Sequence, residues 1–256
     1  MEPTGTIRKH EGFHSRYLDH DRTVVVYRPP GYDAAGDVRY PVLYLHDGQN
    51  LFDPATAFAD EWRADETAQA LITAGAVQPI VIVGVYNTER RVDEYTPTGS
   101  AEHGGGGLAD AYGRMLVEEL KPFIDATYRT RPDAANTGMG GSSLGGLLTM
   151  HVGLRHSAVF GKLAVLSPSV WWDDGVIVRE VEALPKKQPQ RIWLDAGTRE
   201  GESVLADVRR LRDALVAKGW SVGDDLQYAE IEGGEHNERS WAARVGPVLT
   251  FLFPRR

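Results

Sequence analysis

The chain has 256 residues, with 28 Lys or Arg against 36 Asp or Glu, so its net charge is −8 at neutral pH. Hydrophobic residues make up 42% of the sequence, a share typical of globular proteins that excludes extended disorder. The acidic balance, without a basic cluster, argues against binding to nucleic acid or to an anionic membrane surface. The absence of cysteine excludes disulfides, thiolate metal sites and a cysteine nucleophile.

The length favours a single domain that spans residues 1–256, because one α/β domain commonly reaches about 250 residues. The polar segment Met1–Phe13 lacks the apolar core of a secretory signal, and no apolar run reaches the roughly 18 residues of a membrane-spanning helix. We therefore expect a cytoplasmic protein without a membrane span. The sequence does not indicate an oligomeric state.

Taken in chain order, Arg16–Pro29 predicts two short β segments around a polar turn, because Val24–Tyr27 are β-branched or aromatic. From Tyr40 onward, short apolar runs alternate with longer segments of helical spacing, a pattern typical of a parallel sheet. The predicted strands are Tyr40–Leu45, Pro79–Tyr86, Thr137–Ser142, Lys162–Ser167, Arg191–Ala196 and Leu226–Ile231. The predicted helices are Glu61–Ala74, Leu108–Thr127, Leu144–Arg155, Ser203–Lys218 and Ser240–Phe253.

The ends of these elements carry the expected capping residues and loops. Gly219 is predicted to end one helix in a left-handed conformation, and Ser240 is predicted to cap the last helix. Two long loops are predicted, Asn87–Gly107 and Pro168–Leu184, and the second is too short to form a large lid domain. The fold class is therefore predicted to be α/β, with a mostly parallel central sheet flanked by helices.

The clearest catalytic pattern is Gly141-Ser142-Ser143-Leu144-Gly145, which matches G-x-S-x-G with Ser143 at its centre. It follows a predicted strand and opens a predicted helix, as a nucleophile elbow requires. The glycines relieve close contacts around a strained serine, and the helix N-terminus offers N–H groups to an oxyanion. A phosphate-binding loop would need Gly at position 143 or Lys after Gly145, and neither is present.

The histidine that would activate this serine is expected after it and after the acid. The histidines beyond Ser143 are His151, His156 and His236. His151 lies eight residues along the predicted helix, about 12 Å from its start at 1.5 Å per residue, and His156 is farther. His236, in a glycine-containing loop directly after the last strand, is therefore the predicted base.

The acid is expected just past Arg191–Ala196, where a carboxylate can orient the imidazole. Glu200 is the first choice among four candidates. Asp195 lies within the predicted strand, Glu202 is a near alternative, and Asp207 lies about one turn into the next helix.

The loop after Tyr40–Leu45 reads His46-Asp47-Gly48-Gln49-Asn50 and is expected to contribute a donor for the oxyanion. Gly48 allows the backbone to approach, so the predicted oxyanion donors are the backbone N–H groups of Gln49 and Leu144. His46 is predicted to be structural.

Aromatic residues in the two long loops are candidate substrate contacts. Tyr95, Trp171 and Trp172 are predicted to line an open cleft, although a role as core aromatics fits the sequence equally well.

The segment His10-Glu11-Gly12-Phe13-His14 matches the zinc pattern H-E-x-x-H. Two such histidines must share a helical face, whereas this segment has Gly at its middle and leads into a strand. Neither a metal nor another cofactor is therefore expected.

With these residues in order, the sequence resembles the α/β-hydrolase superfamily and, within it, the putative esterase family. That family includes enterochelin esterases, feruloyl and acetylxylan esterases, S-formylglutathione hydrolases and antigen 85 mycolyltransferases. The resemblance spans nearly the whole chain and is carried by residues 40–50, 91–97, 119–125 with 128–130, 140–146, 166–172 and 233–236. One departure concerns the acid, because family members commonly have Asp where Glu200 lies.

The resemblance implies a serine carboxylesterase that hydrolyses a small-molecule ester through a triad of Ser143, His236 and Glu200 and an acyl-enzyme. It favours an intracellular ester, such as a siderophore lactone or a short acyl ester. Two alternatives remain. One is an acyltransferase that uses the same triad with a sugar or alcohol acceptor, and the other is a non-catalytic binding protein on the same fold.

Overall fold

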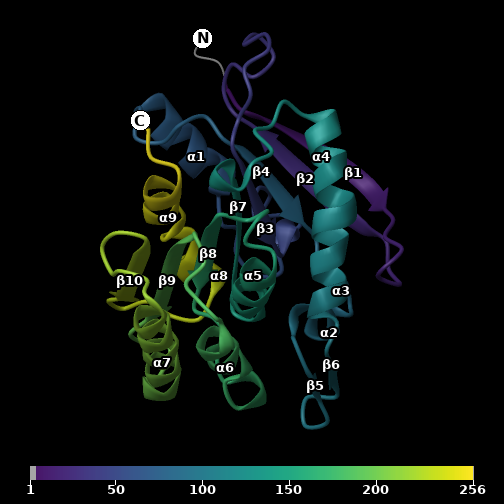
Figure 1. Ribbon diagram of the computed structural model, residues 1–256. Helices are drawn as coiled ribbons and strands as arrows, with labels where there is room; N and C mark the ends of the chain where they lie inside the picture. Colours follow the sequence, from purple (N-terminus) through teal and green to yellow (C-terminus); the bar gives the residue numbers. More distant parts are fainter. Residues whose placement is uncertain (1–3, 256) are drawn as a thin grey trace.

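The computed structural model describes residues 4–255. It contains an eight-stranded sheet with helices on both faces and a small two-stranded hairpin (Figure 1). The strand order of the large sheet is β1-β2-β4-β3-β7-β8-β9-β10. In this order, all neighbours from β4 to β10 pair in parallel. At the other edge, β2 pairs antiparallel with both of its neighbours, β1 and β4. The predicted α/β fold with a mostly parallel central sheet is therefore confirmed.

The elements have the following bounds. The strands of the large sheet are β1 (Thr6–Phe13), β2 (Arg22–Arg28), β3 (Val42–His46), β4 (Val81–Val85), β7 (Thr137–Ser142), β8 (Lys162–Leu166), β9 (Arg191–Gly197) and β10 (Leu226–Ile231), and the hairpin consists of β5 (Gly99–Ser100) and β6 (Gly105–Gly106). The α-helices are α1 (Ala64–Thr73), α2 (Arg91–Tyr95), α3 (Ala109–Arg114), α4 (Lys121–Thr127), α5 (Leu144–Arg155), α6 (Val176–Ala183), α7 (Glu202–Lys218), α8 (Glu238–Ala242) and α9 (Val245–Leu252). Short 3-10 turns lie at η1 (Gly48–Asn50), η3 (Ala134–Asn136) and η4 (Trp172–Asp174), and η2 (Met115–Leu120) is a π-helix.

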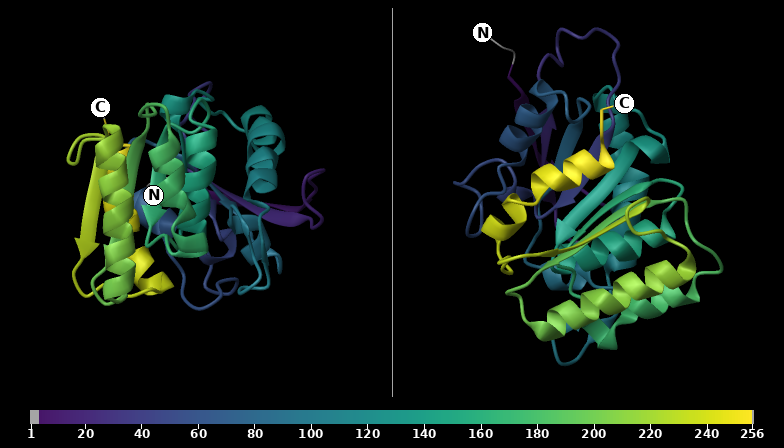
Figure 2. Two further views of the ribbon diagram at one scale, coloured as in Figure 1. Left: turned by 60° about the horizontal axis from the view of Figure 1, so that its bottom comes forward. Right: turned by 90° about the vertical axis from the view of Figure 1, so that its left-hand side faces the viewer.

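The sheet separates two apolar cores, because successive strand residues point to opposite faces. In β8, Leu163 and Val165 join one core, whereas Ala164 and Leu166 join the other. Helices α3, α5, α6 and α7 contribute to the first core, and α1 and α9 contribute to the second. The right-hand view of Figure 2 shows α7 and α9 on opposite sides of the sheet. Burial on both faces explains why the strands β3, β4 and β8 are largely apolar.

Six predicted strands are confirmed, with ends that shift by at most two residues. The pair of β segments predicted within Arg16–Pro29 is only half right, because β2 lies there but its partner β1 is the earlier segment Thr6–Phe13. Most β1 side chains are exposed at the sheet edge. The strand is therefore held by backbone pairing and has no apolar pattern that would reveal it.

Both predicted long loops contain regular structure. The segment Asn87–Gly107 includes α2 and the β5–β6 hairpin, and Pro168–Leu184 includes α6. The sequence of α6 begins Val176-Ile177-Val178, and β-branched residues disfavour helices when exposed. Here these side chains are buried in the first core, so packing overrides local propensity. Between residues 4 and 255, neither segment forms a large lid domain.

Two predicted helices differ in detail. The helix predicted over Leu108–Thr127 contains the π-helix η2, which ends two residues before Pro122, a residue without an N–H for a helical hydrogen bond. The helix predicted over Ser240–Phe253 is split into α8 and α9, and the Asn237 side chain, not Ser240, caps α8. The left-handed Gly219 after α7 is confirmed. Within residues 4–255, no helix combines the length and apolar character needed to cross a bilayer.

The buried face of β8 offers a test of the first core. Leu163 is fully buried, so Leu163→Ala should lower the free energy of unfolding by roughly 2–5 kcal/mol through lost burial and a residual cavity. Val216, 44% exposed on α7, is the control, and Val216→Ala should change that free energy by less than about 0.5 kcal/mol. Urea unfolding followed by circular dichroism measures both. Similar losses in the two variants would contradict this assignment of the core.

Candidate active site

The sequence-predicted residues Ser143, Glu200 and His236 lie after three neighbouring or nearby parallel strands. Ser143 follows β7, Glu200 follows β9 and His236 follows β10. Because the carboxyl ends of parallel strands meet at one edge of a sheet, these loops converge there. The topology alone thus brings together side chains that are up to 93 residues apart in sequence.

Ser143 occupies a strained turn between β7 and α5. Its φ of 58° and ψ of −122° lie where side chains other than Gly are rarely found. A Cβ on Gly141 would lie 3.0 Å from the carbonyl carbon of Gly145, and a Cβ on Gly146 would lie 3.0 Å from the carbonyl oxygen of Leu166. Glycine at both positions therefore avoids close contacts with the backbone of this tight turn.

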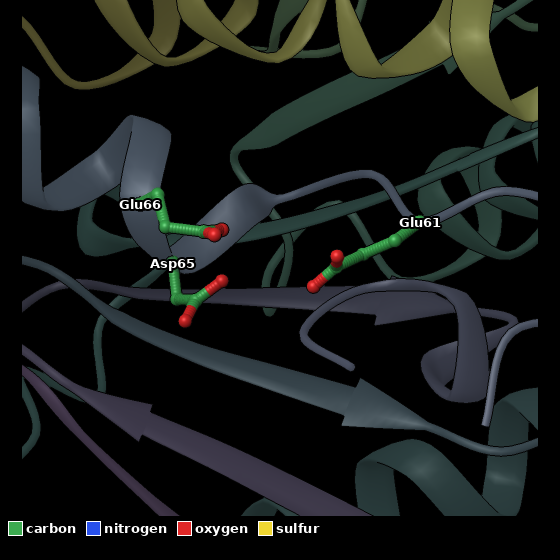
Figure 3. A group of neighbouring side chains, drawn as sticks. All are labelled: Glu61, Asp65 and Glu66. Atoms are coloured by element: carbon green, nitrogen blue, oxygen red, sulfur yellow. The ribbon is translucent and has the colours of Figure 1, made fainter. Parts of the chain in front are cut away.

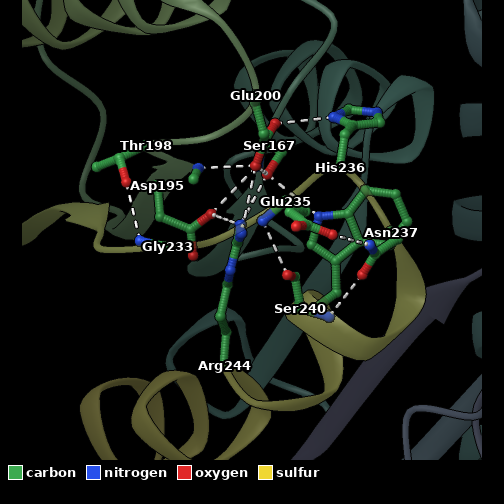
Figure 4. A network of polar contacts seen from close by, with 12 residues as sticks. Ser167, Asp195, Thr198, Glu200, Gly233, Glu235, His236, Asn237, Ser240 and Arg244 are labelled. Atoms are coloured by element: carbon green, nitrogen blue, oxygen red, sulfur yellow. Dashed lines mark hydrogen bonds and ion pairs between the residues drawn. The ribbon is translucent and has the colours of Figure 1, made fainter.

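The three predicted side chains form one hydrogen-bonded line. Ser143 Oγ lies 2.9 Å from His236 Nε2, and His236 Nδ1 lies 2.8 Å from Glu200 Oε2. Figure 4 shows the second contact. The His236 ring also meets the Trp241 ring edge-on, with centroids 5.0 Å apart. An imidazole held in this way can take a proton from the serine while the carboxylate fixes its orientation.

The Glu200 carboxylate is fully buried and has a full set of donors. Its Oε1 accepts hydrogen bonds from Ser167 Oγ at 2.6 Å, Gly197 N at 2.7 Å and Arg244 Nη2 at 3.2 Å. Burial by itself would raise the pKa of Glu200, but the hydrogen bonds from His236, Ser167 and Gly197 outweigh it and lower the pKa to about 2. Glu200 is therefore an anion throughout the neutral range.

The other three candidate acids make no hydrogen bond to His236. Asp195 is buried within β9 and accepts from Arg244 and Trp193. The Glu202 side chain is 91% exposed on α7, and Asp207 pairs with Arg210. Burial raises the pKa of Asp195, while its contact with Arg244 opposes that change.

The two predicted oxyanion donors lie in helical segments, Leu144 at the start of α5 and Gln49 in the short turn η1. Leu144 is the first residue of α5, so its N–H has no acceptor within the helix. Gln49 lies in η1, which packs so closely on β4 that a Cβ on Gly48 would lie 2.5 Å from the carbonyl carbon of Gly84. The requirement for Gly48 therefore arises from close backbone approach.

A partly buried ion pair anchors the loop that carries Gln49. Asp47 has a φ of 55° and accepts two hydrogen bonds from Arg91, from Nε at 2.7 Å and from Nη2 at 2.8 Å. Asn87 donates to the same carboxylate at 2.6 Å. Burial would raise the pKa of Asp47, but Arg91 and Asn87 lower it overall. Next to it, burial lowers the pKa of His46 to about 4, which keeps His46 neutral at neutral pH.

Ser143 and His236 open into a cavity of about 370 Å³. Most of its lining was not predicted from the sequence: the full set is Asp47, Gln49, Asn50, Phe58, Asn87, Thr88, Arg91, Ser142, Ser143, His236, Glu238 and Trp241. Asn87 and Arg91 begin the predicted long loop Asn87–Gly107. Phe58 is 87% exposed, and no sequence pattern marks it.

The three aromatic residues predicted to contact substrate do not line this cavity. Tyr95 and Trp172 are buried in the first core, and Trp172 donates a hydrogen bond from Nε1 to the Thr98 carbonyl at 3.1 Å. The Tyr95 hydroxyl accepts a hydrogen bond from Asp47 N at 3.2 Å, so it supports the loop that carries Gln49 from the side of the core. Trp171 is 45% exposed but packs on His103. Tyr95 and Trp172 therefore act as framework aromatics.

An acidic cluster lies beside the start of α1. One acidic group, Glu61, Asp65 and Glu66, brings its oxygens within 4.8 Å of one another (Figure 3). Asp65 and Glu66 lie in the first turn of α1, where the helix dipole favours acidic side chains. Burial, followed by the hydrogen bond with Glu66, raises the pKa of Asp65 to about 7.

The H-E-x-x-H segment forms part of strand β1 and not a helix. His10 bonds to the Tyr128 hydroxyl at 2.6 Å, and His14 pairs with Asp21 at 2.8 Å. The two histidines therefore have separate partners and do not present a shared helical face.

Comparison with known proteins identifies the family. Residues 15–252 match the family described as "Putative esterase". The chain belongs to this family. A siderophore enterobactin esterase from Emericella nidulans is 30% identical over 252 residues, which cover 85% of this esterase and 82% of the relative. The uncharacterized protein YbbA from Bacillus subtilis is 24% identical and covers 95% of this esterase and 97% of its own length.

Solved structures agree on the fold. The enterobactin esterase from Shigella flexneri, determined in the presence of enterobactin, superposes with a TM-score of 0.80 at 20% identity. The match covers 98% of this esterase and 60% of the Shigella chain. Together with the family match, the named relatives confirm the prediction of an enzyme that hydrolyses carboxylic esters.

The low pKa of Glu200 generates a prediction about acid stability. Its pKa of about 2 lies below the ordinary 4.5, so Glu200 contributes stability that is complete above about pH 4.5 and is lost as the pH falls toward 2. The difference corresponds to about 3 kcal/mol. The destabilisation of Glu200→Gln relative to wild type should therefore be largest near neutral pH and should shrink below pH 4.5.

Urea unfolding of the two proteins at a series of pH values measures this effect. Glu202→Gln, at a side chain that is 91% exposed, is the matched control and should follow the wild-type curve. A Glu200→Gln deficit that stays constant down to about pH 3 would contradict the low pKa.

Proposed function

We propose that this esterase is a serine carboxylesterase in which Ser143 is the nucleophile, His236 the general base and Glu200 the orienting acid. The observation that carries the proposal is the continuous line of hydrogen bonds from Ser143 Oγ through His236 to the buried Glu200 carboxylate. A serine hydroxyl is a poor nucleophile on its own, and an adjacent base held by a third group activates it.

In this mechanism His236 Nε2 accepts the Ser143 hydroxyl proton as Oγ attacks the ester carbonyl. The carbonyl oxygen becomes an oxyanion that accepts hydrogen bonds from the N–H groups of Gln49 and Leu144. The tetrahedral intermediate collapses, and His236 returns the proton to the departing alcohol. Water, deprotonated by His236, then attacks the acyl-enzyme and releases the carboxylic acid and free Ser143.

The substrate is proposed to be a small-molecule ester that fits the cavity beside Ser143. A volume of about 370 Å³ lies within the usual range for small-molecule sites. Phe58 and Trp241 offer apolar contact, and Arg91 and Asn87 offer hydrogen-bond donors. Two relatives, from Emericella nidulans and Escherichia coli, are named as enterobactin esterases, which favours siderophore-like esters. The cytoplasmic location expected from the sequence stays a prediction.

Replacement of the nucleophile is the primary test. Ser143→Ala should reduce kcat for p-nitrophenyl acetate by roughly three orders of magnitude or more, because the covalent route is removed. It should also prevent labelling by a fluorophosphonate probe, with mass spectrometry locating the label on Ser143 in the wild type. Ser203→Ala, an exposed serine at the start of α7, is the matched control and should behave as wild type. Near-normal turnover in Ser143→Ala would refute the mechanism.

The cavity lining gives a second test. Phe58→Ala should raise KM for p-nitrophenyl butyrate severalfold and leave kcat within about twofold, because an apolar contact is lost without a change in the reacting groups. Trp171→Ala removes an aromatic side chain outside the cavity and should leave both constants unchanged. A raised KM in Trp171→Ala together with an unchanged KM in Phe58→Ala would instead indicate that the loop aromatics contact the substrate.

A further inference from the structure

A second carboxylate lies behind Glu200 and is joined to it by one arginine and one serine (Figure 4). Arg244 donates from Nη1 to Asp195 Oδ1 at 2.8 Å and from Nη2 to Glu200 Oε1 at 3.2 Å. Ser167 Oγ accepts from Arg244 Nη1 at 2.7 Å and donates to Glu200 Oε1 at 2.6 Å. The four side chains thus form a closed network on the side of Glu200 that faces away from His236.

This network is tightly enclosed. The side chains of Asp195 and Glu200 are fully buried, and that of Arg244 is 2% exposed. A Cβ on Gly234 would lie 2.8 Å from Arg244 Nη2, so the glycine before Glu235 and His236 leaves the space that the guanidinium fills. The conformation of Ser167, with a φ of 40°, is also unusual for a residue other than Gly. Such strain persists only where the surrounding structure enforces it.

Asp195 is ionised in this network. Its carboxylate contacts donors alone, namely Arg244, the Trp193 indole at 2.7 Å and the Ser167 N–H at 3.2 Å, so a carboxyl proton would have no acceptor. The buried cluster of Asp195, Glu200 and Arg244 therefore carries one net negative charge. Without Asp195, the positive charge of Arg244 would cancel that of Glu200.

We propose that Arg244 and Asp195 are positioning residues for the triad. Arg244, with Ser167, holds Oε1 so that Oε2 meets His236 Nδ1. Asp195 balances the charge of Arg244, so that Glu200 acts on His236 as a full anion. The proposal rests on the proposed function, because the charge matters when His236 becomes an imidazolium after it accepts the serine proton.

Other charged groups also face His236 and are left unchanged by the test. The cavity side carries Asp47, Arg91 and Glu238. Glu235 precedes His236 and pairs with Arg199 at 3.7 Å. Asp47 and Arg91 neutralise each other, as do Glu235 and Arg199, so Glu238 and the buried cluster set the local charge balance.

The experiment measures the pH profile of kcat/KM for p-nitrophenyl acetate at the isosbestic wavelength of the product. In Asp195→Asn, the cancelled charge weakens the imidazolium form, so the acid limb should move to lower pH by about half a unit or more. We also expect kcat to fall about tenfold. Asp225→Asn is the matched control. Asp225 pairs with Lys187 directly before β10, at the edge where the parallel strands begin and away from His236, so this variant should leave the pH profile unchanged.

A double variant separates the effect of the lost charge on the pH profile from the effect of structural disruption on kcat. Asp195→Asn with Arg244→Met removes both charges and leaves Glu200 again unopposed, so the acid limb should return to its wild-type position while kcat stays low. An acid limb that does not move in Asp195→Asn, or that stays shifted in the double variant, would overturn the charge-balance role. Wild type and Ser143→Ala are measured in the same assay, so failure of the serine mechanism is detected separately.

Ser167→Ala keeps the proposal testable if Asp195→Asn does not fold. This variant retains all three buried charges and removes the hydroxyl that contacts Glu200, Arg244 and the Trp241 indole. We expect about a tenfold loss in kcat, because Glu200 loses a hydrogen bond that fixes it, and a KM within about twofold of wild type, because Ser167 does not line the cavity. An unchanged kcat would overturn the positioning role of the network.

Discussion

The site depends on a carboxylate that is removed from water and kept charged. Burial of an anion is costly unless hydrogen bonds replace the lost hydration. Glu200 has such bonds from Ser167, Gly197, Arg244 and His236. Ser167 follows β8, Gly197 ends β9, His236 lies in the loop after β10 and Arg244 directly precedes α9. The anion therefore ties four separate segments together at this edge of the sheet and gives His236 one favoured orientation.

Crowding at this edge explains where the glycines lie. Gly48, Gly141, Gly197 and Gly234 each stand where an added Cβ would come within about 3 Å of other backbone or buried side-chain atoms. None of the four has a positive φ, so they are needed for space and not for conformational freedom. The close approach brings the Gln49 turn, the Ser143 elbow and the two loops with Glu200 and His236 into one small volume.

The chemistry of the site was more predictable from sequence than its surroundings. Ser143, Glu200 and His236 follow three segments that the sequence predicts as parallel strands, and the carboxyl ends of such strands meet at one edge of a sheet, so their proximity could be predicted. The cavity lining was not predictable, because Phe58 and Glu238 acquire their position only through tertiary packing. The sequence left the role of Tyr95 undecided for the same reason. Its ring fills the core beside His46 and Tyr112, whereas Arg91, four residues earlier, lines the cavity. Helix α6 and strand β1 were missed because burial in one case and backbone pairing in the other replaced the usual patterns.

Strand β1 has a consequence for how the molecule behaves among its copies. It occupies one end of the sheet order, so the backbone groups on its outer side have no strand partner within the sheet. Such an edge would accept a strand from another chain if its side chains were flat and apolar. In β1 the exposed residues Arg8, Lys9 and Glu11 are charged, and the register is interrupted between His10 and Phe13. Charge and irregularity together make the edge a poor template for further strands, which guards the folded enzyme against intermolecular β aggregation.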